Sequence, residues 1–87
     1  GEAISLRARI DGLLGTLGVA RRLTFESLFG ERPTRGYVIV TFLAVLELMK
    51  QHVVEAVQEA ILGPIVIELL VEDVRTVSLD LLEEYDG

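Results

Sequence analysis

The side chains that most often carry out catalysis are few in this 87-residue chain and show no catalytic spacing. The single histidine, His52, follows a predicted helix, where its charge suits the negative end of the helix dipole. Ser5, Ser27 and Ser78 have no identifiable base to activate a hydroxyl as a nucleophile. There is no phosphate-binding loop of the type GxxxxGK followed by Ser or Thr. The sequence therefore predicts that the chain is not an enzyme.

The residues that could bind metals or anions also have simpler interpretations. The acidic group Glu83-Glu84-Asp86 lacks the regular spacing of oxygen ligands that a calcium loop needs, so we interpret it as a solvated chain end. The chain has no cysteine, which excludes disulfides and thiolate metal sites. Arg21 and Arg22 are adjacent in a neutral region and are interpreted as surface charges. We therefore expect no cofactor.

The C-terminal segment supplies the whole net charge of −6. Residues 1–67 carry seven acidic and seven basic side chains, whereas residues 68–87 carry seven acidic side chains and one arginine. Nucleic-acid-binding domains usually carry a basic stripe, which is missing here. The longest uncharged run, residues 36–46, has eleven residues, about half of what a membrane span needs. We expect a cytoplasmic fragment of a longer protein, with no membrane segment.

The first predicted element is an amphipathic helix, because apolar residues recur at helical spacing in residues 6–17. Ser5 is a suitable N-cap and Gly18 a suitable end. One buried stripe results, formed by Leu6, Ile10, Leu13, Leu14 and Leu17.

The middle of the chain alternates between short and long elements. Residues 21–25 alternate in polarity and predict a brief strand, and residues 24–30 predict a two-turn helix that ends at Gly30. After a turn that contains Pro and Gly, Thr34 is a suitable N-cap for a long helix over residues 34–51.

The last elements are two strands. Residues 52–58 and 64–70 are rich in β-branched residues and flank the turn signal Gly63-Pro64, which predicts a hairpin. The resulting order, α-β-α-α-β-β, is that of an α+β winged helix, in which a helix-turn-helix core carries a two-stranded wing. We assign residues 1–70 to this domain and residues 71–87 to an acidic tail.

The tail is expected to be dispensable for folding, since both wing strands are complete before it. Ser78 is a candidate N-cap for a short helix that presents Leu79 and Leu82. Deletion of residues 72–87 is expected to leave the melting temperature nearly unchanged.

The long helix is apolar on nearly every side, although a surface helix needs only one apolar stripe. At about 100° per residue, Val38, Phe42, Val45, Leu46 and Met49 share roughly a third of the circumference, which we assign to the core. The other apolar residues are either wrapped by neighbouring elements or exposed to a partner, and both interpretations stay open. The predicted core is Leu6, Ile10, Leu13, Leu14, Leu17, Phe25, Phe29, Phe42, Val45, Leu46 and Met49. Phe42→Ala is expected to cost about 3–5 kcal/mol.

DNA is the usual ligand of a winged helix, but this long helix is a poor reader of bases. Val40, Ala44 and Leu48 stand where a recognition helix needs Arg, Asn or Gln. Arg35 and Lys50 are its only basic residues. This composition favours docking on a protein, and a DNA-binding regulator stays as the alternative function.

Residues 38–65 resemble one known family. Residues 41–48, TFLAVLEL, are similar to the TFLALLEL helix of the ScpA kleisins of bacterial SMC complexes. A Gln-containing strand segment, residues 57–59, and the GPI of residues 63–65 match the segments that follow in the family. Upstream, residues 23–30, LTFESLFG, resemble the family's F-x-E-L-F segment. The resemblance covers residues 5–69 and points to the C-terminal domain of that family.

The resemblance implies a mechanical function in chromosome condensation and segregation. A kleisin bridges the two heads of an SMC dimer, and its C-terminal winged helix binds one ATPase head. ScpB would bind other parts of the full-length protein, and the complex would lie in the cytoplasm on the nucleoid. ATP chemistry would belong to the SMC partner.

The proposed docking surface is apolar and combines the long helix with the wing. Strand register is uncertain by one residue, so Val66 and Glu68 are the alternative wing set. If this surface fails, Ile39 and Leu43 on the opposite flank are the next candidates. The predicted partner-binding residues are Tyr37, Val40, Ala44, Leu48, Ile65, Ile67 and Leu69.

Overall fold

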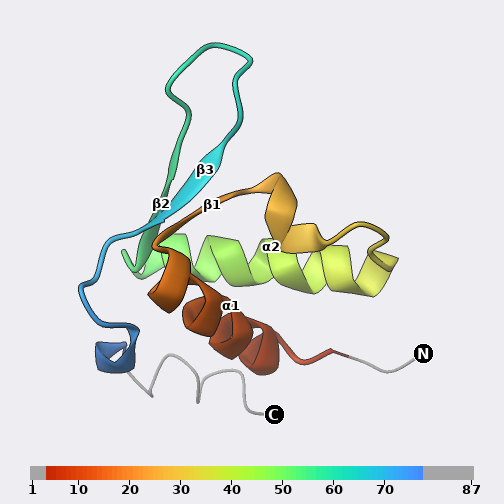
Figure 1. Cartoon of the computed structure of the whole chain (residues 1–87). Coiled ribbons are helices and arrows are strands. Elements are labelled where there is room, and N and C mark those ends of the chain that lie inside the picture. Colours follow the sequence, from red (N-terminus) through yellow and green to blue (C-terminus); the bar gives the residue numbers. More distant parts are fainter. Residues whose placement is uncertain (1–3, 78–87) are drawn as a thin grey trace.

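Two α-helices lie across each other below a three-stranded antiparallel sheet, whose long hairpin projects away from them (Figure 1). The computed structural model describes residues 4–77. The predicted α+β class, the two long helices and the hairpin are confirmed. The elements are α1 (Leu6–Ala20), β1 (Arg22–Thr24), η1 (Glu26–Phe29), α2 (Arg35–Lys50), β2 (Val54–Val57), β3 (Val66–Leu69) and η2 (Val74–Thr76).

Helix α1 begins where the sequence predicts and ends two residues later. The Ser5 hydroxyl accepts a hydrogen bond from the Ala8 N–H at 2.9 Å, which confirms the predicted N-cap. Gly18 does not end the helix, which continues to Ala20. Arg21 closes it in a left-handed conformation, with φ of 67°, and its N–H donates to the Leu17 carbonyl at 2.8 Å.

The predicted helix over residues 24–30 is instead a single 3-10 turn, η1. Helix α2 has the predicted cap, since the Thr34 hydroxyl accepts from the Tyr37 N–H at 3.1 Å. It ends at a reversal in which His52 has a φ of 61° and its N–H donates to the Met49 carbonyl at 3.0 Å. The structural interpretation of His52 as a residue of the helix terminus fits this position.

Strand β3 is central in the sheet, between β1 and β2. Both pairings are antiparallel, and Ile67 lies opposite Leu23 on one side and Ala56 on the other. Ile67 and Leu69 are buried, so this face of the sheet covers the helices. Val66 and Glu68, the alternative register set, lie on the outer face and are half-buried.

The core forms where α1, α2 and the inner face of the sheet meet. The stripe of α1 is confirmed, with Ile10, Leu13, Leu14 and Leu17 at most 6% exposed, and Val45 is buried as predicted. The assignment of Phe42 and Leu46 to the core is wrong, because these side chains are 46% and 45% exposed, and so is that of Val38 in the same arc, which is 37% exposed. The reason is that α2 packs through another face. Half-buried residues at the edge of this core include Leu6, Phe25, Phe29 and Met49.

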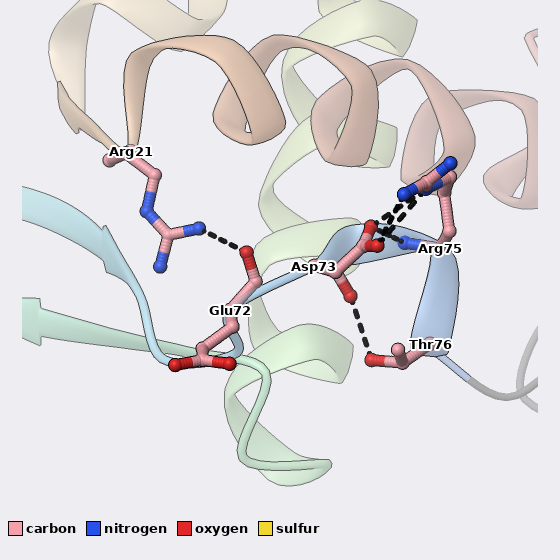
Figure 2. A network of polar contacts seen from close by, with 5 residues as sticks. All are labelled: Arg21, Glu72, Asp73, Arg75 and Thr76. Carbon is pink, nitrogen blue, oxygen red and sulfur yellow. Dashed lines mark hydrogen bonds and ion pairs between the residues drawn. The ribbon is translucent and has the colours of Figure 1, made fainter.

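Residues 71–77 form a strap across the end of α1, against the expectation that the whole tail is dispensable. The Arg21 guanidinium donates to the carbonyl oxygens of Val71 and Glu72, at 2.8 and 2.7 Å, and Figure 2 shows the second of these bonds. Val71, Val74 and Val77 pack against the core. We therefore expect stability to depend on this strap, whereas the helix predicted at Ser78 lies outside the described residues.

The turn of the strap is closed by an ion pair between Asp73 and Arg75, at 2.8 Å (Figure 2). Hydrogen bonds from the Arg75 side chain, and next from its backbone N–H, lower the pKa of the Asp73 carboxyl to about 2. A depressed carboxyl pKa stabilises the fold above the unfolded pKa of about 3.9. This contribution is lost as the pH falls towards 2, so the strap keeps its ion pair at neutral pH.

Two glycines of α1 test whether the strap packs as described. Gly15→Ala is expected to stabilise the domain by about 0.5–1 kcal/mol, since a Cβ there meets nothing within 4 Å and alanine favours the helix. Gly18→Ala is expected to lose that gain, because its Cβ would lie 3.0 Å from Val74 Cγ2. Chemical denaturation measures both.

A chain shortened after Leu70 is the control for this pair. In this shortened chain, which lacks Val74, Gly15→Ala and Gly18→Ala should raise the free energy of unfolding by equal amounts. Equal gains in the full chain would contradict the packing of Val74 on Gly18.

Candidate protein-docking surface

Helix α2 buries one apolar face and exposes another. Its buried side chains are Val40, Thr41, Ala44, Val45 and Leu48. At about 100° per residue, the exposed apolar side chains cover an arc of about 140° beside them. We name this arc the α2 docking face; it consists of Val38, Ile39, Phe42, Leu43 and Leu46, which are between 37% and 51% exposed.

Arg9 on α1 and the small residues of α2 determine which face is buried. Ala44 is fully buried, and its small side chain suits close approach of the two helices. Thr41 is also fully buried, and its hydroxyl accepts a 2.9 Å hydrogen bond from Arg9 Nε. Arg9 Nη2 donates to the Leu28 carbonyl at 2.8 Å, so this side chain ties α1, η1 and α2 together. The buried hydroxyl is thereby satisfied, and the rotation of α2 is fixed.

Tyr37 belongs to the same arrangement. It is half-buried, and Arg9 Cζ lies 4.7 Å from the centroid of its ring, in cation–π geometry. Its position at the start of α2 is therefore determined by a contact inside the domain.

The predicted docking residues are mostly in the core, and the expectation that they are exposed is wrong. Val40, Ala44 and Leu48 are 8%, 0% and 1% exposed because they pack towards α1. Ile67 and Leu69 are buried because odd-numbered residues of β3 point inwards. Ile65 is 43% exposed, as predicted. The alternative flank, Ile39 and Leu43, is the exposed one.

The α2 docking face continues through two phenylalanines towards the wing. Phe25 makes edge-to-face contacts with Phe29 and Phe42, with ring centroids 4.9 and 6.2 Å apart. The Phe25 N–H donates to the Ile65 carbonyl at 2.8 Å, which anchors η1 to the wing. On the other side, the exposed Ile4 lines a hollow with Ile39 and Leu43. One apolar surface therefore connects the N-terminal residues, α2 and the wing.

Charges flank this surface at its two ends. Arg35 in the first turn and Lys50 in the last turn fall within the same arc as the α2 docking face. Within this arc, every helix position between Arg35 and Lys50 is apolar: the five residues of the α2 docking face and the half-buried Met49. The surface therefore combines an apolar centre with a cation at each end. This position of Arg35 and Lys50 is also a sequence signal that marks the solvent side of α2, and it conflicts with the assignment of Phe42 and Leu46 to the core.

Other kinds of site find little support in residues 4–77. No group of three or more His, Asp or Glu side chains there could hold a metal ion. In the same residues, neither long helix has the length together with the apolar character that a membrane span requires. The main feature of this part of the chain that a ligand could bind is the α2 docking face, with Arg35 and Lys50 at its two ends.

Comparison with known proteins gives one consistent result. The family model described as "Segregation and condensation protein ScpA" matches residues 2–70. A "Segregation and condensation protein A" of Xylella fastidiosa (strain Temecula1) is 39% identical over 86 residues, which are 99% of this chain and 28% of the relative. That of Myxococcus xanthus is 38% identical over 68 residues, 76% of the chain and 24% of the relative.

A third relative, from Listeria monocytogenes serotype 4a, is 48% identical over 59 residues, 66% of the chain and 23% of the relative. The chain therefore spans only about a quarter of the length of these curated relatives. No solved structure matches the chain significantly.

Proposed function

Since the chain belongs to the ScpA family of segregation and condensation proteins, as its resemblance in residues 38–65 predicts, we propose that it docks on the ATPase head of an SMC protein. It would be the C-terminal winged-helix domain of the kleisin, formed by residues 1–70, with residues 71–87 as an acidic tail whose first seven residues form the strap. The order of α1, β1, η1, α2 and the β2–β3 hairpin supports this interpretation of the fold. In it, η1 takes the place of the second helix and the hairpin is the wing.

The α2 docking face is the observation that carries the proposal. Five large apolar side chains line one arc of a helix in a domain that has a separate, complete core. Contiguous exposed apolar surface of this kind usually marks an interaction site. Its burial would drive docking at about 25 cal/mol per Å², before the costs of association. Acidic side chains of the head would complement Arg35 and Lys50.

The wing offers a second means of attachment. Strand β2 pairs with β3 on one side, and no other described strand pairs with its outer edge. An unpaired edge presents backbone donors and acceptors that another sheet can use. The edge of β2 would thereby extend a sheet of the SMC head.

The role that follows is mechanical. The domain would close one end of a kleisin bridge, so that head engagement driven by ATP opens and closes a ring around DNA. Its own residues would carry out no chemistry. ScpB would bind other parts of the full-length protein, and the complex would act on the nucleoid in the cytoplasm.

The proposal is tested by co-elution with the isolated SMC head of the same organism in size-exclusion chromatography. We expect a complex of one domain and one head that withstands moderate salt. Separate elution at micromolar concentrations would contradict the proposal. The alternative, a DNA-binding regulator, predicts sub-micromolar binding of random duplex in a low-salt gel shift, which we do not expect because α2 exposes few hydrogen-bond donors.

A further inference from the structure

A hollow of about 310 Å³ lies between the wing and η1, adjoining the α2 docking face without belonging to it. One wall comes from the start of η1, with Phe25 and Glu26, and the other from the wing, with Leu62 and Ile65. Four of the side chains in the lining are apolar, namely Phe25, Leu62, Pro64 and Ile65, while Thr24, Glu26 and Gln58 add polar groups. In Figure 1 the wing loop rises above η1.

Hydrogen bonds within the wing hold the hollow in shape. The Gly63 N–H donates to the Ala60 carbonyl at 2.9 Å, and the Gln58 side-chain amide donates to the Gly63 carbonyl at 2.8 Å. Leu62, which lies in the turn between Ala60 and Gly63, is 96% exposed and has a left-handed φ of 64°. A leucine rarely adopts this conformation, so the surrounding turn must hold it there. Because these hydrogen bonds already fix the backbone of the wing turn, binding a side chain beside it orders little further backbone.

Two carboxylates without ion-pair partners lie at this place. Glu26 lines the hollow, and it also lines a neighbouring one together with Glu31. Among residues 4–77 neither carboxylate forms an ion pair. By contrast, Glu59 and Glu68 on the wing both pair with Arg22, at 3.3 and 3.1 Å. The hollow therefore combines apolar walls with uncompensated negative charge.

Apolar walls beside a carboxylate fit one kind of side chain. Lysine and arginine bury an aliphatic stem on apolar surface and keep a cationic end for a carboxylate. The negative charge disfavours polyanionic ligands such as nucleic acid. Phe25 contributes to the hollow and also contacts Phe42 of the α2 docking face, so one protein can cover both.

We propose that this hollow receives a lysine or arginine side chain of the protein that docks on the α2 docking face. The stem would lie against Phe25 and Ile65, and its cationic end would pair with Glu26, with Glu31 close by. The wing would thus be a charge-selective second contact. The inference rests on the proposed function for the identity of the partner.

The test is a calorimetric titration of the 87-residue chain with the SMC head at two salt concentrations. The variant Glu26→Gln/Glu31→Gln is expected to bind about tenfold more weakly, and its affinity to depend less on salt. The matched control is Glu72→Gln, an exposed glutamate of the strap outside the hollow, the α2 docking face and the edge of β2, and it should bind like the wild type. Circular dichroism should show the same melting temperature for all chains.

A third variant tests the apolar wall separately. Asparagine tolerates the left-handed conformation, so Leu62→Asn removes the apolar side chain while the turn of the wing stays intact. We expect this variant to bind the SMC head several-fold more weakly.

The outcomes separate this inference from the proposed function. If the wild-type chain binds the SMC head and the Glu26→Gln/Glu31→Gln variant binds it with the same affinity and salt dependence, only the inference is overturned. A wild-type chain that does not bind the head would overturn both.

Discussion

Replacing Leu48 with alanine is expected to lower the free energy of unfolding by about 2–5 kcal/mol. Leu48 is 1% exposed and belongs to the core cluster that joins α1, α2 and the sheet. Its removal would leave a cavity among side chains from all three, and small domains have a total stability of only about 5–15 kcal/mol. Chemical denaturation monitored by circular dichroism measures the loss.

The matched control is Leu46→Ala, the same change two residues earlier on α2. Leu46 is 45% exposed, so its truncation should cost well under half as much. Equal losses at the two positions would contradict the orientation of α2. Leu48→Glu, which would preserve the fold if Leu48 were exposed, is expected to unfold the domain instead, because the carboxylate would be buried without a partner.

Replacing Leu43 with glutamate is expected to weaken binding to the SMC head at least a hundredfold while the domain stays folded. Leu43 is 48% exposed in the α2 docking face, so glutamate remains solvated in the free domain. In the complex its charge would be desolvated against apolar surface, a cost of several kcal/mol at the centre of an interface. Calorimetric titration with the isolated head measures the change.

Leu70→Glu is the control for this substitution. Leu70 is 47% exposed, but it follows β3 and lies outside the α2 docking face. It should bind with wild-type affinity and melt at a similar temperature. A Leu43→Glu variant that binds as well as Leu70→Glu would exclude this face as the interface.

The helices and strands can be predicted from the sequence wherever a single hydropathy or capping pattern is present. Helix α1 has a single apolar stripe between polar sides, so its buried residues could be named in advance. The caps at Ser5 and Thr34 follow from hydroxyl side chains directly before apolar periodicity. The wing follows from two β-branched runs around Gly63-Pro64.

The orientation of α2 could not be read from hydropathy, because both of its faces are apolar. The arc around Phe42 is apolar throughout, whereas the buried arc around Ala44 contains Thr41, so hydropathy alone favours the face that is exposed. Tertiary contacts decide the orientation instead. The decisive contact is the hydrogen bond from Arg9 to Thr41, between residues 32 positions apart. Ala44 on the inside and Arg35 and Lys50 on the outside were the available clues. Phe42→Ala should accordingly cost less than the 3–5 kcal/mol expected of a buried phenylalanine.

The strap does not follow from the sequence for a related reason. Residues 71–77 contain three apolar side chains, Val71, Val74 and Val77, and so short a run in an acidic segment does not predict a packed element. What holds them is long-range: the Arg21 guanidinium reaches two backbone carbonyls about fifty positions away, and Val74 fills the space above Gly18. Neither contact leaves a local pattern in the sequence.

Site-specific cross-linking tests most directly whether the α2 docking face contacts the SMC head. The chain has no cysteine, so Leu43→Cys and Val19→Cys each carry one thiol for a short photoreactive label. Val19, 89% exposed on α1, is the control position outside the face. On illumination with the isolated head, we predict a cross-linked product of one domain and one head from position 43, and little from position 19. A product from position 19 but not from position 43, or equal yields from both, would contradict docking through α2.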